Sequence, residues 1–166
     1  MQFNPQALTQ RPRCQLLSCK AYEAELPWGK RYVAVCRDVR VPDELLESAS
    51  RGLPPSRLLV RLAEEPDPCA LAVALSYVEE DYSSGLARLR TPSLQALLYL
   101  TSSRQVDEAI SRSKDGDILA FGAESPQALT DLMRSFSLSP GPLHPLPQCD
   151  RRSLGTLAAS RLDIMS

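Results

Sequence analysis

Residues 68–78 (PCALAVALSYV) constrain the fold of this chain more than any other part of the sequence. Asp67 and Pro68 form a typical helix start, because Asp can cap a first turn and Pro suits its beginning. The residues that follow are apolar around the whole helix and not along one stripe. Such a helix must be buried over most of its circumference, so we expect it at the centre of the domain.

Length and composition fit one domain with flanking extensions. The 166 residues are 43% hydrophobic but only 5% aromatic, so Leu, Val, Ala and Ile must fill the core. No apolar run reaches about 18 residues, so we expect no membrane span. The net charge of −1 gives no overall attraction to nucleic acid or to an anionic membrane, so any such contact must come from a local patch.

The N-terminal residues and the cysteines favour a reducing compartment. Residues 1–13 lack the basic start and apolar block of a secretory signal. The cysteines are odd in number and irregularly spaced, which favours reduced thiols over disulfides. No further Cys or His pair completes a zinc site with the first two cysteines. The cysteines are Cys14, Cys19, Cys36, Cys69 and Cys149.

Short strands and helices are predicted along the rest of the chain. Residues 31–37 (RYVAVCR) and 117–121 (DILAF) have strand patterns, and 58–62 is ambiguous between a strand and a loop. Gly52 suits the left-handed cap of a preceding helix. Helices are predicted at 42–51, 67–84, 91–101, 103–113, 125–136 and 153–164.

This order of elements predicts an α/β fold. We expect a single two-layer domain, residues 31–166, in which a small mixed sheet packs against several helices. Residues 1–30 show little periodicity and are expected to form an N-terminal extension that is partly without regular structure. The Pro- and Gly-rich segment 137–149 cannot be one regular element throughout.

The sequence contains no residue set that supports a common enzymatic mechanism. His144, the only histidine, lies among prolines in PGPLHPLPQ, where a solvated loop residue is expected rather than a base or ligand. There is no nucleophile elbow, phosphate loop or dinucleotide fingerprint. The acidic run 79–81 could bind a hard cation, but its place at the end of an apolar helix favours solvation. We therefore expect a protein that is not an enzyme and holds no cofactor or metal.

Two local features are compatible with binding. Arg88, Arg90 and Arg104 flank the 91–101 helix, where they could hold phosphates, although solubilising charge gives the same pattern. The final helix, 153–164, carries apolar residues that either dock on the chain's own core or face a partner. These apolar residues are Leu154, Leu157, Leu162 and Ile164.

Residues 70–110 resemble the kinase-binding subunits of the KEOPS (EKC) complex, the PRPK-binding protein family. That family has an alanine-rich helix, a glycine, a basic residue, an Arg-Thr pair that opens a helix, a small polar turn, and a helix with hydrophobic-x-Glu-Ala. The segments 36–40 (CRDVR), 114–116 (KDG) and 153–157 (SLGTL) also resemble family segments. The matching residues between 70 and 110 are, in order, Gly85, Arg88, Arg90, Thr91, Ser102, Val106, Glu108 and Ala109.

The resemblance covers roughly residues 31–164, and its specificity lies in the order and spacing of its parts. The chain departs from the family pattern at Tyr77, where the family often has Lys, and at Gln95, where the family has Glu after Arg-Thr. The segment before the final helix is shorter than in the family.

The resemblance implies a non-catalytic accessory subunit of the complex that makes the threonylcarbamoyl modification of the adenosine next to the tRNA anticodon. The subunit would bind the complex's small atypical kinase/ATPase and, through it, meet the threonylcarbamoyl-transferase subunit, in the cytoplasm and nucleus. Archaeal relatives hold the single-stranded 3′ end of the tRNA. The implied tRNA-binding residues are Arg88, Arg90, Thr91 and Arg104, and the implied kinase-binding residues are Leu154, Leu157, Arg161 and Leu162.

Two other classes of function remain open. A small-molecule-binding α/β enzyme or sensor would need a concave site, for example one where Lys114, Asp115 and Asp117 converge. A freestanding RNA-binding domain would bind tRNA with no kinase present, and the near-neutral charge counts against it.

Overall fold

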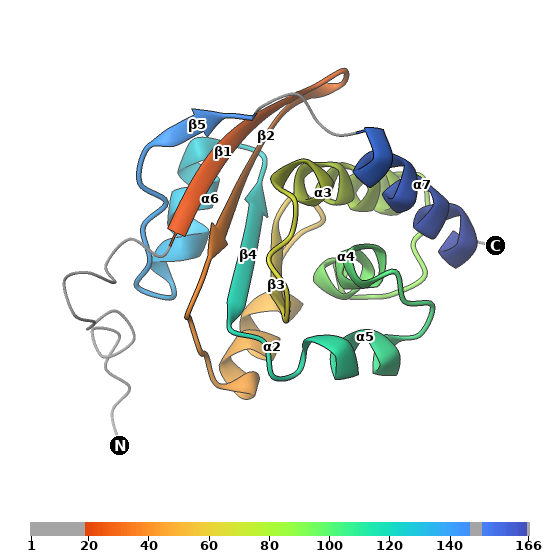
Figure 1. Ribbon diagram of the computed structural model, residues 1–166, viewed down its shortest axis with the longest axis horizontal. Coiled ribbons are helices and arrows are strands. Elements are labelled where there is room, and N and C mark those ends of the chain that lie inside the picture. Colours follow the sequence, from red (N-terminus) through yellow and green to blue (C-terminus); the bar gives the residue numbers. More distant parts are fainter. Residues whose placement is uncertain (1–18, 147–150, 166) are drawn as a thin grey trace.

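The computed structural model describes residues 19–146 and 151–165 (Figure 1). Five strands form one mixed sheet in the order β3–β4–β2–β1–β5. All neighbouring strands are antiparallel except β1 and β5, which run parallel. The strands are β1 (Cys19–Leu26), β2 (Gly29–Cys36), β3 (Leu58–Leu62), β4 (Ile118–Ala123) and β5 (Leu143–Pro145).

Helices pack against both faces of this sheet. One hydrophobic cluster joins one face to α3, α4, α5 and α7, and a second joins the other face to α2 and α6. Figure 1 shows α3, α4 and α7 on the side of the sheet opposite α6. The predicted α/β fold with a small mixed sheet is therefore confirmed, but helices cover both faces of the sheet, so the domain has three layers where two were expected. The helices are α2 (Asp43–Arg51), α3 (Pro68–Ser83), α4 (Pro92–Thr101), α5 (Val106–Ser113), α6 (Pro126–Arg134) and α7 (Arg151–Met165).

Helix α3 is the central helix that the sequence predicted. The Asp67 carboxylate accepts a hydrogen bond of 2.9 Å from the Cys69 backbone N–H, which satisfies one of the free donors of the first turn. Leu71 and Leu75 have no exposed surface, because α3 lies between the sheet on one side and α4 and α7 on the other. A buried helix of this kind fixes the positions of everything packed around it.

The other helix starts that the sequence predicted are also observed, with small differences at the helix ends. Helix α4 begins at Pro92, and the Ser125 hydroxyl caps α6 by accepting a bond of 3.0 Å from the Ala128 N–H. Residues 58–62, ambiguous in sequence, form the edge strand β3. Gly52 ends α2 with φ −85°, so the expectation of a left-handed cap there is wrong.

Strand β1 occupies a stretch in which no regular element was predicted. Its sequence, CKAYEAEL, lacks β-branched residues, and only Ala21 and Ala24 are buried, so the period-two signal is weak. Pairing with β2 along the whole strand compensates for this local composition. Residues 1–18 of the expected extension lie outside the described part of the chain.

The expectation of reduced thiols is wrong for the cysteines of the sheet. Cys19 and Cys36 face each other at the open end of the β1–β2 hairpin and form a disulfide. Cys69, at the start of α3, is disulfide-bonded as well. Sequence spacing hid the first pair, because the hairpin brings together cysteines that are 17 residues apart.

Gly116 lies where the turn after α5 passes against the end of β3. A Cβ atom added at this position would lie 2.1 Å from the Leu62 carbonyl oxygen. That distance is far below any normal contact, so only glycine allows the two backbones to approach this closely.

Strand β5 covers the outer edge of β1 with three residues. Leu143, His144 and Pro145 pair with residues 21–23, and the Leu146 N–H donates to the Glu23 carbonyl at 3.0 Å. The Pro-rich segment thus contains one short strand.

Candidate functional site

A groove of about 500 Å³ runs beside the edge strand β3, between α2, α4 and α5. Its apolar lining includes Leu94, Leu97 and Ile110, and Ile110 is 44% exposed although it is large and hydrophobic. A concave surface with an apolar floor and a charged rim is the usual form of a ligand site. The remaining lining residues are Asp43, Leu46, Glu47, Ser50, Arg51, Leu59, Val60, Arg61, Thr91, Ser93, Ser113 and Lys114.

The rim of this groove carries unbalanced positive charge. Arg61 and Arg51 are neutralised by ion pairs with Asp43 and Glu47. Lys114, in contrast, makes no ion pair with any residue in the described part of the chain. An anionic group that enters the groove would therefore meet an available cation.

The four predicted tRNA-binding residues divide between two places. Thr91 lines the groove, and Arg90, which directly precedes it, is exposed and makes no ion pair within residues 19–146 and 151–165. Arg88 and Arg104 instead contact α7: the Arg88 guanidinium donates to the Ile164 carbonyl at 2.8 Å, and Arg104 lies 3.5 Å from the Asp163 carboxylate.

The four predicted kinase-binding residues also have different environments. Leu162 is 74% exposed, which is the largest exposure among the large hydrophobic residues described. Leu157 is buried in the chain's own core, and Leu154 is partly buried against the same cluster. Arg161 points toward α3. The outward face of α7 therefore presents Leu162, while its other predicted residues attach the helix to the domain.

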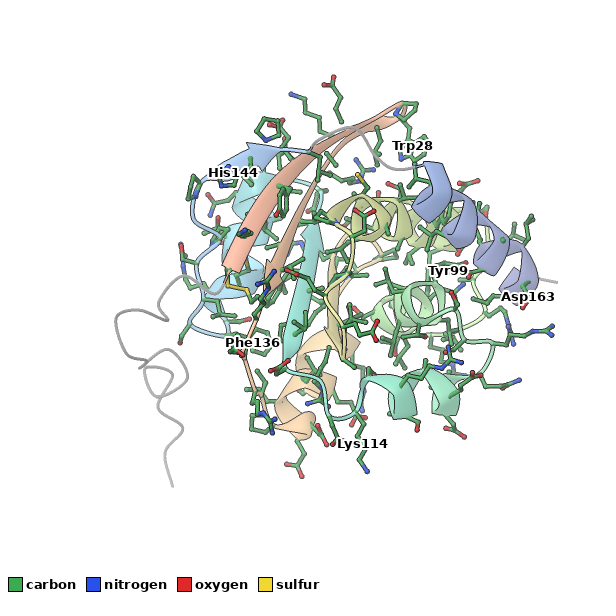
Figure 2. All side chains as sticks on the ribbon, in the orientation of Figure 1. Trp28, Tyr99, Lys114, Phe136, His144 and Asp163 are labelled. Atoms are coloured by element: carbon green, nitrogen blue, oxygen red, sulfur yellow. A yellow bond between two sulfur atoms is a disulfide. The ribbon has the colours of Figure 1, made fainter. Side chains whose placement is uncertain are left out.

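Arg161 belongs to a buried polar network, which we define as Tyr77, Asp81, Gln95, Tyr99 and Arg161. The guanidinium of Arg161 donates to one Asp81 carboxylate oxygen at 2.9 Å and lies 4.3 Å above the centre of the Tyr77 ring. The other Asp81 oxygen accepts from the Tyr99 hydroxyl and from the Gln95 amide, at 3.2 Å from the latter. Asp81, Gln95 and Tyr99 are at most 1% exposed (Figure 2 labels Tyr99, beside α7).

The network changes the acid–base properties of its members. Burial, and the hydrogen bond that the hydroxyl donates to Asp81, raise the pKa of Tyr99 above its usual value, so this tyrosine stays protonated. Burial acts to lower the pKa of Arg161, but the Asp81 and Glu80 carboxylates outweigh it and raise the pKa. The network therefore combines a buried ion pair between Asp81 and Arg161 with two uncharged donors, Gln95 and the protonated Tyr99.

Asp81 was expected at a solvated helix end, and this expectation is wrong. The three residues of the acidic run have different environments. Glu79 pairs with Arg31 of β2 at 2.6 Å. Glu80 is largely exposed, whereas Asp81 is fully buried. The helical spacing could have predicted the burial of Asp81, because this residue follows the buried Val78 by three positions and so lies on the same face of α3.

The residues proposed for an enzymatic alternative do not gather in the groove. Lys114 lines it, but Asp115 and Asp117 do not. His144 is exposed on β5, with its ring 6.3 Å from that of Tyr22 (Figure 2). Within residues 19–146 and 151–165, no cluster of His, Cys, Asp or Glu could hold a metal ion. No helix in that part of the chain is both long and apolar enough to cross a membrane.

No protein-family model, curated protein or solved structure matches this chain. The resemblance to the KEOPS kinase-binding subunits thus rests on the sequence motifs within residues 36–40, 70–110, 114–116 and 153–157. Two residues that depart from that pattern, Tyr77 and Gln95, lie together in the buried polar network. Gln95 donates its amide N–H to Asp81, which a Glu carboxylate could not do, so the Gln suits this neighbour.

Proposed function

We propose that this chain is a non-catalytic accessory subunit of the KEOPS (EKC) complex. In this role it binds the small atypical kinase/ATPase of the complex and contacts the 3′ end of the tRNA whose adenosine is modified. The sequence support is the order of the motifs between residues 70 and 110. The structural observation that supports the proposal most is the groove beside β3, where Thr91 and Lys114, which has no ion pair among the described residues, border an apolar floor.

The groove suits the end of a single-stranded RNA for two physical reasons. Apolar side chains such as Leu94 and Ile110 can contact a base, and Lys114 and Arg90 can attract phosphates without reading sequence. Binding of this kind loses affinity steeply as salt rises. Arg88 and Arg104 contribute less, because their guanidinium groups already contact α7.

An RNA-binding measurement at two salt concentrations tests this part of the proposal. A short single-stranded RNA with a free 3′ end is titrated against the wild-type chain and the variants Arg90→Gln and Lys114→Gln. Each variant should weaken binding and reduce the slope of log K against log salt by about one. Arg134→Gln is the matched control, because Arg134 is an exposed arginine on α6, across the sheet. Wild-type affinity in both groove variants would exclude these cations from the site.

The exposed face of α7 is the proposed kinase-binding surface. An ordinary interface buries about 800 Å² on each partner, more than one exposed leucine supplies, so neighbouring elements must contribute. Leu86, 60% exposed, lies in the loop whose Arg88 contacts α7 and is the first candidate. Leu157 acts only by holding α7 in place.

Co-elution with the KEOPS kinase in size-exclusion chromatography tests this surface. Leu162→Glu should abolish the complex, because a charge would enter the apolar centre of the interface. Ile110→Glu is the matched control: it places the same charge at an exposed apolar residue of α5 and should leave kinase binding intact. If wild-type chain and kinase do not co-elute, the proposed function fails and a freestanding RNA-binding domain becomes the better proposal.

The proposed location, cytoplasm and nucleus, must be compatible with the disulfides. Disulfides are rare in those compartments, except in hyperthermophiles, whose intracellular proteins are rich in them. Alkylation of free thiols in intact cells before lysis, followed by mass spectrometry of the Cys19 and Cys36 peptides, measures their state. A reduced pair in the native cell would show that the proposed compartment does not maintain this bond.

A further inference from the structure

The loop that joins α3 to α4, residues 84–91, depends on side chains for its structure. It contains no helix or strand, so its backbone groups need other hydrogen-bond partners. The Arg88 and Leu89 N–H groups both donate to the side-chain oxygen of Gln95, at 3.3 and 3.2 Å. The Leu89 carbonyl accepts from the Tyr82 hydroxyl. Gln95 and Tyr82 therefore hold the middle of this loop in place.

Gln95 is in turn linked to α7 through Asp81. Its amide nitrogen donates to Asp81, and the opposite oxygen of Asp81 is bonded to Arg161 of α7. Asp81 is fully buried, so its charge has no access to water. If α7 moved away, a buried carboxylate would lose its counter-ion, which is strongly unfavourable. The carboxylate and the two side chains that donate to it would then rearrange.

The same loop leads directly to the groove. Arg88 is bonded to α7 through the Ile164 carbonyl, and two residues later the chain reaches Arg90 and Thr91, beside the apolar floor. The described residues thus provide a continuous chain of contacts from α7, through Arg161, Asp81 and Gln95, to the loop that leads to the rim of the groove.

We propose that the buried polar network couples the position of α7 to the conformation of the 84–91 loop, so that α7 and the groove influence each other. The RNA part of this inference rests on the proposed function; the coupling itself does not. A partner that binds α7 and shifts it would change the affinity of the groove for its ligand, and by reciprocity the ligand would change the affinity for that partner. Arg161 is then a positioning residue for the groove, although it lies outside it.

Hydrogen exchange of the full chain tests the coupling without any ligand. Arg161→Met keeps the apolar stem but removes the guanidinium. The Arg88 and Leu89 amides, to which Arg161 makes no hydrogen bond, should then exchange about 3- to 30-fold faster. Arg134→Met is the control, because it removes an exposed arginine across the sheet and should leave these amides unchanged. Faster exchange confined to α7, with the loop unchanged, would overturn the proposal.

A second variant removes the risk that Arg161→Met does not fold. The double change Asp81→Asn with Arg161→Met leaves no buried unpaired charge, while residue 81 can still accept from Tyr99 and Gln95. Because the Arg161 guanidinium no longer holds residue 81 from the side of α7, the Arg88 and Leu89 amides should still exchange faster than in the wild type. Wild-type exchange in a folded double variant would refute the coupling.

Titration of the same variants with a single-stranded RNA of about ten nucleotides adds the functional measurement. The coupling predicts an affinity lower by about 3- to 30-fold in the double variant and unchanged in Arg134→Met. Equal affinity in the wild type and the double variant would show that α7 does not influence the groove. A wild-type chain that binds no RNA would instead contradict the proposed function, and loop exchange would still decide the inference.

Discussion

Replacing Gly116 by alanine should destabilise the domain strongly. The new Cβ atom would lie 2.1 Å from the Leu62 oxygen, 2.4 Å from the Leu62 carbonyl carbon and 2.8 Å from the Ala63 nitrogen. All three are backbone atoms, so no side chain can rotate away. Gly116 is not among the glycines with positive φ, so an alanine backbone is acceptable there and the expected effect is purely steric.

The loss of stability in Gly116→Ala can be estimated from the backbone displacement that the new Cβ atom requires. An ordinary contact begins near 3.4 Å, so β3 and the turn after α5 must separate by more than 1 Å. Overpacking of this kind costs about 1–3 kcal/mol, and a rigid backbone contact puts the cost near the upper end. With an m-value of about 1–3 kcal/mol/M, the urea midpoint should fall by at least about 1 M.

Urea unfolding followed by far-UV circular dichroism measures this change, and Gly52→Ala is the matched control. Gly52 has φ −85° and no atom within 4 Å of an added Cβ. Alanine should therefore stabilise the chain there by about 0.4–1 kcal/mol, because it reduces the entropy of the unfolded state. If Gly116→Ala leaves the midpoint unchanged or raises it, the close approach of the two backbones is not as described.

Three further outcomes follow from the described contacts. Burial raises the pKa of Tyr82 to about 12 and also raises that of Tyr99, so above pH 10 the unfolded chain releases these two protons first and the free energy of unfolding should fall by up to about 1.4 kcal/mol per pH unit for each tyrosine. Urea titrations between pH 7 and 11 measure this fall, and an unchanged midpoint above pH 10 contradicts the raised pKa values. Replacing both Cys19 and Cys36 by alanine should cost about 2–3 kcal/mol, since the bond joins residues 17 apart; calorimetry tests this, and a Tm equal to that of the wild type would show that the bond does not stabilise the fold. Leu157→Ala should cost about 2–4 kcal/mol in urea unfolding, whereas a neutral result would mean that α7 does not pack on the core.

Elements with strong local signals were predictable from the sequence. The apolar run of α3, its Asp-Pro start and the Ser-Pro start of α6 gave the right elements, because the same residues set both the local conformation and the burial. Strand β1 was not predictable, because its stability comes from pairing with β2. Its alanines and charged residues carry little information about that pairing.

The candidate site was predictable only in part. Thr91 lines the groove and Arg90 directly precedes it in the chain, but nothing in the sequence links them to Lys114, which lines the same groove. Asp81 was missed because carboxylates are rarely buried unless they are paired, and its partner Arg161 is 80 residues away in the chain. Contacts over such distances arise from the packing of α7, which no local pattern encodes.

Strand β5 has a consequence for how this protein behaves at high concentration. Exposed sheet edges invite strands from other molecules, which is a common route to aggregation. At the edge of the sheet beyond β1, the outermost strand is β5. It is only three residues long and ends in a proline, which has no N–H to donate to an incoming strand. The short Pro-containing strand therefore closes this border of the sheet against self-association, and lengthening it or replacing Pro145 would reopen that border.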